Sequence, residues 1–429
     1  MILPTRTLPL ILAFAVLIAG APAQTPAPAP APVTSPEAYE TPAGFSASQY
    51  LPAEWLAGPH HRVRDSAQSD GLMIHYTVDS DFGIYYCAGT RDLKRCVNEI
   101  SAIGKLVEVS KGDMFAEGLK RSVEAPVEAV KNIVGDPAGS VEEAPSTFRH
   151  LFSKVDSAVE KTRKRVGRGI AGEGWRDPYA GSKVGESLKN LAGFQRAKLD
   201  TARQLGVDPY SDNARLQEEI EKVTWAFFAG GLPLRIGAAA ASGGASAVAQ
   251  GAAMTVGLPE EIYKLIPAEL SLRDSQAMAA MGINQAAIDS VILNRGISIS
   301  SRHRVVSSLG TLPAGPGRAE VVRVLAASSD AHRARMLADI LELLAARHSA
   351  NPYRSIEVKE RLPIGVLADG SIEVVAPIDY LSWTPLVKEF VARQDFGGGV
   401  KRLVISCKVS SLATDRLSAA GWTIAPPTD

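Results

Sequence analysis

"GLMIHYTVDSDFGIYYCAGTRDLKRCVNEISAIGKLVEV", from Gly71 to Val109, contains two kinds of periodicity in immediate succession. Its first half is rich in β-branched and aromatic residues around a turn at Asp79-Ser80-Asp81, so it predicts a two-stranded hairpin. Its second half carries apolar residues at helical spacing, namely Leu93, Cys96, Val97, Ile100, Ile103, Leu106 and Val107. A hairpin packed on an amphipathic helix is a small α+β unit, which we expect to span residues 45–134.

The C-terminal segment, residues 351–429, alternates short strands with two helices. RSIEV, PIGVLA and SIEVVAP are typical of strands, with Asp369-Gly370 as a hairpin turn. Thr384 and Pro385 provide the N-cap and the first residue of the helix LVKEFVARQ. A strand, a helix and a final strand follow, namely KRLVISCKV, SSLATDRLSAAG and WTIA. The order β-β-β-α-β-α-β predicts a small α/β domain with a parallel crossover.

Residues 186–350 predict a helical domain of unequal helices with no fixed repeat, which argues against a solenoid. Gly206 suits the end of one helix, and VDPYSDN forms a turn in which Asp212 or Asn213 caps the next. The expected fold class is therefore α+β and predominantly helical, with an N-terminal β-hairpin plus helix, a central irregular helical region and a small C-terminal α/β domain.

A Gly/Ala-rich stretch, Val223–Gly257, lies inside the helical domain and has Arg235 as its only formal charge. The break at Gly230–Pro233, the internal glycines and the scarcity of Leu disfavour a membrane span. Small residues at helical spacing favour close helix packing instead. We expect a buried helical segment entered through Trp225, Phe227 and Phe228, with membrane insertion as the alternative.

The N-terminus has the pattern of a secretory signal peptide over residues 1–23. Arg6 precedes the apolar run Leu8–Ile18, and Ala21-Pro22-Ala23 gives a cleavage site. Residues 24–44 form a Pro/Ala-rich linker, which predicts either an extended tether or a plain disordered segment. We therefore expect an exported bacterial protein, periplasmic or secreted.

In residues 135–185, Pro and Gly interrupt any regular secondary structure. This pattern predicts an irregular basic linker region. Its basic run consists of Lys161, Arg163, Lys164, Arg165 and Arg168. Such a run is either a solvated face or a contact for anionic lipid or a cell-wall polymer.

The charges of the chain balance, with 46 Lys and Arg against 46 Asp and Glu. Loss of residues 1–23 removes only Arg6, which leaves 45 against 46. A neutral exported chain has no general attraction to nucleic acid, so we expect no nucleic-acid partner. The oligomeric state is not determined by these features.

The three cysteines, Cys87, Cys96 and Cys407, fit neither a disulfide framework nor a zinc pattern. Cys87 ends a predicted strand and Cys96 lies one turn into the following helix. In an oxidising compartment this spacing permits a Cys87–Cys96 disulfide, and the sequence leaves open whether it forms.

Sequence signatures of the common hydrolases, zinc proteases, P-loop NTPases and dinucleotide-binding enzymes are missing. We therefore assign no catalytic, cofactor-binding or metal-ligating residues. Two polar groups stand out: the motif Asp208 to Asn213, best explained by turn and cap roles, and Ser406-Cys407-Lys408 near the end of a strand, where α/β sheets bind ligands.

Four motifs together resemble a family of exported bacterial proteins of unknown function: GLMIHYTVDSDFG, LKRCVNEISAIGKL, GVDPYSDN followed by VTWAFFAGGL, and VSSLATDRLSAAGW. The resemblance covers most of the chain from Ala43 to Ala425. It implies a bacterial envelope location and no particular activity or functional residue.

These observations favour an envelope protein with a structural or interaction role. Its expected partner is another envelope protein, an anionic lipid or a cell-wall polymer. One alternative is a peripheral membrane protein acting through residues 223–257. Another is an enzyme whose site carries none of the known signatures.

We predict that the mature protein begins at Gln24, because signal peptidase cleaves after a small residue in an A-x-A pattern. Intact-mass measurement on protein recovered from the expressing cells checks this. Ala23→Arg, which places a large charged residue at the cleavage site, should leave the signal segment attached. Wild-type protein that retains Met1 would contradict the prediction.

Overall fold

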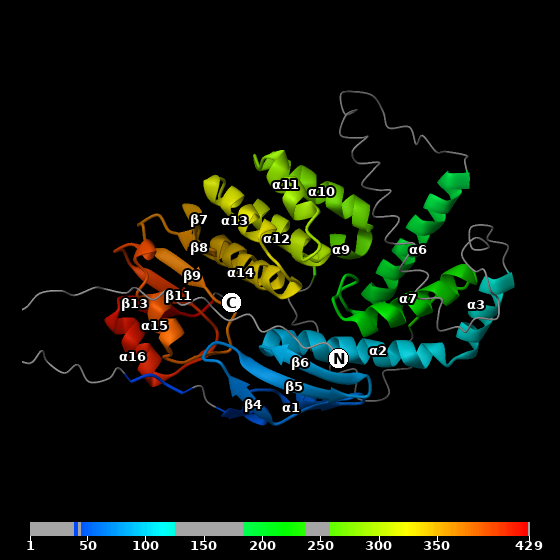
Figure 1. Ribbon diagram of the computed structural model, residues 1–429, viewed down its shortest axis with the longest axis horizontal. Helices are drawn as coiled ribbons and strands as arrows, with labels where there is room; N and C mark the ends of the chain where they lie inside the picture. Colours follow the sequence, from blue (N-terminus) through cyan, green and yellow to red (C-terminus); the bar gives the residue numbers. More distant parts are fainter. Residues whose placement is uncertain (1–37, 42–43, 125–182, 237–257, 428–429) are drawn as a thin grey trace, which may run out of the picture. The chain divides into compact units, whose positions relative to one another are not determined.

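The computed structural model describes residues 38–41, 44–124, 183–236 and 258–427. Glu40–Asp429 forms one compact unit, whose elements are labelled in Figure 1. The signal segment, most of the tether, the basic run Lys161–Arg168 and the Gly/Ala stretch from residue 237 to 257 lie outside the described residues. The expectations for these segments therefore remain predictions.

An antiparallel sheet contains the predicted hairpin. β5 (Ile74–Ser80) and β6 (Gly83–Ala88) pair along their length with Ser80 opposite Gly83. The turn lies at Asp81-Phe82, slightly later than predicted, because the Ser80 hydroxyl donates to the Gly83 carbonyl and accepts from the Phe82 amide. Shorter strands complete the sheet in the order β1-β4-β5-β3-β2: β1 (Gly44–Ser46), β2 (Ala57–Gly58), β3 (His61–Val63) and β4 (Ser66–Ser69).

The predicted helix is α2 (Thr90–Ser110), and it takes part in two hydrophobic cores. Leu93 and Ile100, in its first half, are buried against the sheet. Ile103 and Leu106, in its second half, are buried among other helices. These helices are α3 (Asp113–Glu124), α6 (Lys183–Leu205) and α7 (Ala214–Ala229). One apolar stripe thus joins the sheet to the helical region.

The central region contains unequal helices, as the sequence predicts: α9 (Glu261–Lys264), α10 (Pro267–Ala280), α11 (Gln285–Ile292), α12 (Ile299–Thr311), α13 (Pro316–Ala326) and α14 (Ala331–Ala350). Side-chain caps begin several of them, for example Ser298 for α12 and Asp330 for α14. None of the helices in the described ranges is long and apolar enough to cross a membrane.

The described beginning of the Gly/Ala-rich stretch is the end of α7. Val223 and Phe227 are buried there, and Trp225 and Phe228 make edge-on contacts with the Phe194 ring. The aromatic residues therefore lie at a helix–helix contact, as expected for the entry to a core.

The C-terminal sheet has the order β13-β11-β9-β8-β7. Its strands are β7 (Ser355–Lys359), β8 (Leu362–Val366), β9 (Ile372–Val375), β11 (Lys401–Val404) and β13 (Trp422–Ala425). The first three are antiparallel, and β9, β11 and β13 are parallel. α15 (Pro385–Val391) and α16 (Ser411–Ala419) form the crossovers, and β10 (Tyr380–Leu381) and β12 (Lys408–Val409) make a separate parallel pair. The single strand predicted over KRLVISCKV is divided between β11 and β12, which belong to different sheets. The α+β, mostly helical fold class is confirmed.

Alternate residues of the parallel strands face two different cores. Val375 and Val404 pack with α14 and the central helices, whereas Val374 and Leu403 pack with α15 and α16. The sheet therefore lies between α14 on one face and α15 and α16 on the other (Figure 1).

Asp379 connects the C-terminal domain to the N-terminal sheet. Its carboxylate accepts hydrogen bonds from the backbone amides of Ile74 (3.1 Å) and Thr90 (3.0 Å), which start β5 and α2. The Leu72 carbonyl accepts in turn from the amides of Asp379 and Tyr380. The first strand of the hairpin is therefore positioned by residues more than 300 positions later in the chain, since Ile74 and Asp379 are 305 residues apart.

Gly317→Ala should destabilise the protein by about 1–3 kcal/mol, because an added Cβ would overlap the carbonyl oxygen of Ile356 where α13 meets β7. Gly310→Ala is the matched control, because the nearest atom to its Cβ is the Met281 methyl at 3.8 Å. This exposed helical position should gain up to about 1 kcal/mol. Urea denaturation measures both changes, and equal effects at the two glycines would refute the proposed packing.

Candidate functional site

The motif VDPYSDN forms the turn between α6 and α7. Gly206 ends α6 with a φ of 69°, as predicted. Asp208 Oδ1 accepts from the Tyr210 amide at 2.8 Å, and Asn213 caps α7 by accepting from the Leu216 amide at 3.2 Å. The structure therefore shows the expected turn and cap contacts in this motif.

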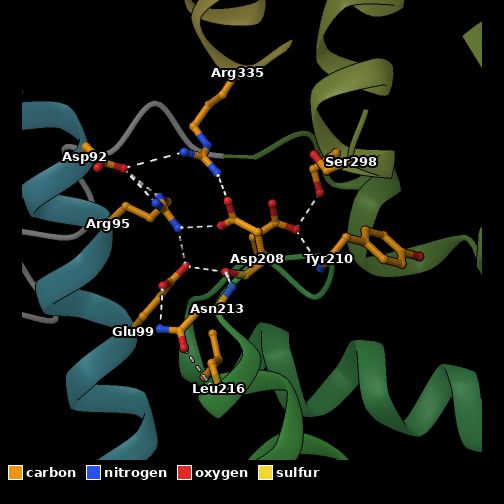
Figure 2. Close-up of polar contacts among 12 residues, drawn as sticks. Asp92, Arg95, Glu99, Asp208, Tyr210, Asn213, Leu216, Ser298 and Arg335 are labelled. Carbon is orange, nitrogen blue, oxygen red and sulfur yellow. Dashed lines mark hydrogen bonds and ion pairs between the residues drawn. The ribbon is translucent and has the colours of Figure 1, made fainter. Parts of the chain in front are cut away.

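Glu99 of α2 lies against this turn and is 2% exposed. Its carboxylate accepts hydrogen bonds from Ser211 Oγ at 2.6 Å, Asn213 Nδ2 at 3.0 Å and Arg95 Nη1 at 3.1 Å (Figure 2). A buried carboxylate is tolerated only when it is paired and hydrogen-bonded, and Glu99 meets both conditions.

Two arginines extend these contacts to a third part of the chain. Arg95 bonds to Asp92 at 2.7 Å and to Asp212 at 3.1 Å. Arg335 of α14 bonds to the same two carboxylates, Asp212 at 2.8 Å and Asp92 at 3.6 Å (Figure 2). We call this set, Asp92, Arg95, Glu99, Asp212 and Arg335, the charged junction.

The charged junction contains three carboxylates and two guanidinium groups. Burial opposes ionisation of Asp212, but the charges of Arg335 and Arg95 outweigh it and lower the pKa of Asp212 below its usual value. All five side chains are engaged in ion pairs. The arrangement holds α2, the turn and α14 together and presents no activated nucleophile.

Asp208 has a different environment from the charged junction. Burial raises its pKa, and the hydrogen bonds from Ser300 Oγ at 2.5 Å and from the Tyr210 amide oppose this change only in part. Both hydrogen bonds are accepted by the same oxygen, Oδ1. A proton on Oδ2 therefore leaves both bonds intact.

Cys87 and Cys96 lie in the same core, between β6 and α2, and both are free thiols in this structure. A hydrogen bond with Cys87 and burial raise the pKa of Cys96. The two cysteines thus lie close together, and the disulfide remains a prediction. The other predicted contact residues, Lys161 to Arg168, lie outside the described ranges.

The three consecutive residues Ser406, Cys407 and Lys408 follow β11, and their side chains lie in different environments. Ser406 lines a small cavity, burial raises the pKa of Cys407 to about 11, and Lys408 Nζ lies 4.6 Å from the centre of the Tyr50 ring. In the described part of the chain, no three His, Cys, Asp or Glu side chains are placed to hold a metal ion.

The outer edge of β6 is the most exposed apolar feature of the N-terminal sheet. The Gly89 amide donates to the Ile74 carbonyl, whereas the Thr77 carbonyl accepts from Arg64 on the opposite side of β5. Bonded and non-bonded pairs alternate in an antiparallel ladder, so the backbone groups of Ile84 and Tyr86 point away from β5. No other described strand pairs with β6.

The side chains on this edge are also exposed. Tyr86 is 78% and Ile84 54% exposed, while Cys87, on the opposite face of β6, is buried under α2. An edge strand with unpaired backbone groups and apolar side chains can pair with another extended chain.

The charged junction was missed by sequence reasoning, but one signal was present. Glu99 lies on the apolar stripe of α2, three residues after Cys96 and four before Ile103. A carboxylate at such a position requires a buried cation or hydroxyl partner. Arg95 lies one turn away on α2, but the other partners, Ser211 and Asn213, could not be found, because they are 112 and 114 residues from Glu99.

Comparison with known proteins gives no relative: no protein-family model, curated protein or solved structure matches this chain.

Asp208→Asn should gain stability relative to wild type as the pH rises from 4 to 7. Burial raises the pKa of Asp208 above 3.8, so above that pH the folded state binds more protons than the unfolded state. The stability this group contributes is complete below pH 3.8 and is lost as the pH rises through the raised pKa. Asparagine keeps the Oδ1 acceptor and does not titrate.

Urea denaturation at pH 4 and pH 7 measures this difference. Asp200→Asn, on the exposed surface of α6, controls for the change in net charge and should differ from wild type by less than about 0.5 kcal/mol at both values. A stability difference between Asp208→Asn and wild type that is the same at both pH values would refute ionisation of a buried Asp208.

Proposed function

We propose that this is an exported envelope protein with an interaction role and that β6 is the strand through which it binds another protein. The observation that carries the proposal is the outer edge of β6, where Ile84 and Tyr86 expose side chains and backbone groups together. Export is supported by the signal-like pattern of residues 1–23 and by the resemblance to exported bacterial proteins.

The chemistry of the edge favours a protein over a lipid. The outward amides and carbonyls of Ile84 and Tyr86 repeat about every 6.8 Å, the two-residue spacing of a strand. An extended peptide presents donors and acceptors at the same spacing, and its alternate side chains can cover the exposed rings and methyl groups. A lipid acyl chain has no such groups. The partner best fitted to this edge is therefore an extended segment of an envelope protein.

The charged junction supports a binding role over catalysis. Its five side chains are paired with one another and hold α2, the turn before α7 and α14 together. Membrane association through residues 223–257 and anionic contacts through Lys161 to Arg168 would depend on segments outside the described ranges. The edge of β6, in contrast, lies within the described residues.

A photo-cross-linking amino acid at position 84, in the full chain made in its native cells, should form a discrete adduct with a second protein. Tyr86→Pro in the same chain should reduce the adduct about tenfold. Proline removes the outward amide at residue 86 without breaking the β5–β6 ladder, because that amide is not bonded to β5. The same cross-linker at Leu386, which is 59% exposed on α15, should give no such adduct.

Three outcomes would overturn the proposal. The first is an adduct of equal yield from position 386, which indicates nonspecific capture. The second is an adduct with the mass of two copies of this chain, which indicates self-pairing. The third is an adduct with lipid or glycan alone.

A further inference from the structure

A cavity of about 40 Å³ lies where three parts of the chain meet. Arg91 in the first turn of α2, Arg347 near the end of α14 and Ser406 after β11 provide its polar lining. The rest is mainly apolar and includes the residues at the ends of the parallel strands β9 and β11. Carboxyl ends of parallel strands and junctions between substructures are common ligand-binding positions.

The two charged residues that line this cavity are both arginines, Arg91 and Arg347. Arg347 uses Nε and Nη2 to bind Glu373, at 3.0 and 3.1 Å, and Glu373 is fully buried. The Tyr353 hydroxyl donates to the same carboxylate at 3.0 Å, and Arg402 Nη1 lies 3.6 Å from it. Glu373 is therefore neutralised within the protein, and its charge does not balance that of Arg91.

Arg91 and Ser406 have donors available. Neither side chain makes a hydrogen bond or ion pair to any part of the chain that the structure describes, and both are exposed. The lining also contains the apolar residues Leu343, Ala346 and Val375. Lower local polarity strengthens the attraction between a guanidinium group and an anion.

We propose that this cavity is a binding site for a single carboxylate group. The cavity has room for a small polar group. A planar carboxylate matches a guanidinium fork, which can bind it through two parallel hydrogen bonds. The ligand is therefore the acidic end of a small organic acid, with the rest of the molecule in solvent.

This site is independent of the proposed function, because it lies at the C-terminal sheet and uses no residue of β6. Saturation-transfer NMR with acetate as the probe tests it, using the mature full-length protein at low salt. Wild-type protein should show saturable binding with a dissociation constant of about 1–10 mM. Arg91→Gln should weaken binding about tenfold and Ser406→Ala about threefold. Arg416→Gln, the same change at an exposed position of α16, should leave binding unchanged.

Both binding-site variants change exposed side chains, so they should keep the wild-type thermal midpoint, which verifies folding. Arg91→Lys, which keeps the charge but loses the planar fork, should also weaken acetate binding. The proposal is wrong if acetate shows no saturable binding at concentrations up to about 100 mM, far above the expected dissociation constant. It is also wrong if Arg416→Gln reduces binding as much as Arg91→Gln, or if phosphate binds this cavity more tightly than acetate.

Discussion

The buried carboxylate of Glu99 is the constraint on which the arrangement of the helices depends. Removing the partners of a buried ion pair typically destabilises a protein by about 3–5 kcal/mol. Glu99 therefore requires Arg95, Ser211 and Asn213 at hydrogen-bonding distance, which fixes the rotation of α2 relative to the start of α7. Since Asn213 also caps α7, one side chain serves both the helix end and the buried charge.

The remaining members of the charged junction follow from this first contact. Arg95 has more donors than Glu99 can accept, and it bonds to Asp92 and Asp212 as well. Asp212 then accepts from Arg335, which brings in α14 and with it the core shared by the central helices and the C-terminal sheet. Polar contacts thus specify the orientation of helices that apolar packing alone would leave less defined.

Local signals predicted much of the fold because periodicity, caps and turn residues act over a few positions. Thr384 and Gly206 each mark a helix end that was predicted and that the structure contains. The strands β1 to β4 were missed, because two to four residues are too few to show alternation and they are held by pairing with β5.

The candidate sites were less predictable for a physical reason. Whether β6 is an edge strand depends on which strands pair with β5, a long-range property that no local pattern records. The cavity beside Arg91 likewise needs α2, α14 and β11 to meet. Only the position of Ser406 at a strand end gave a local indication of it.

The hydrogen bonds of Asp379 have a consequence for how this chain folds. The amide of Thr90 at the start of α2 finds its acceptor 289 residues later, so the hairpin–helix unit is incomplete until most of the chain has been made. Such long-range contacts slow folding and expose unpaired strand groups meanwhile. The contacts that complete the hairpin–helix unit therefore form only after residue 379 has been synthesised, long after the N-terminal sheet itself.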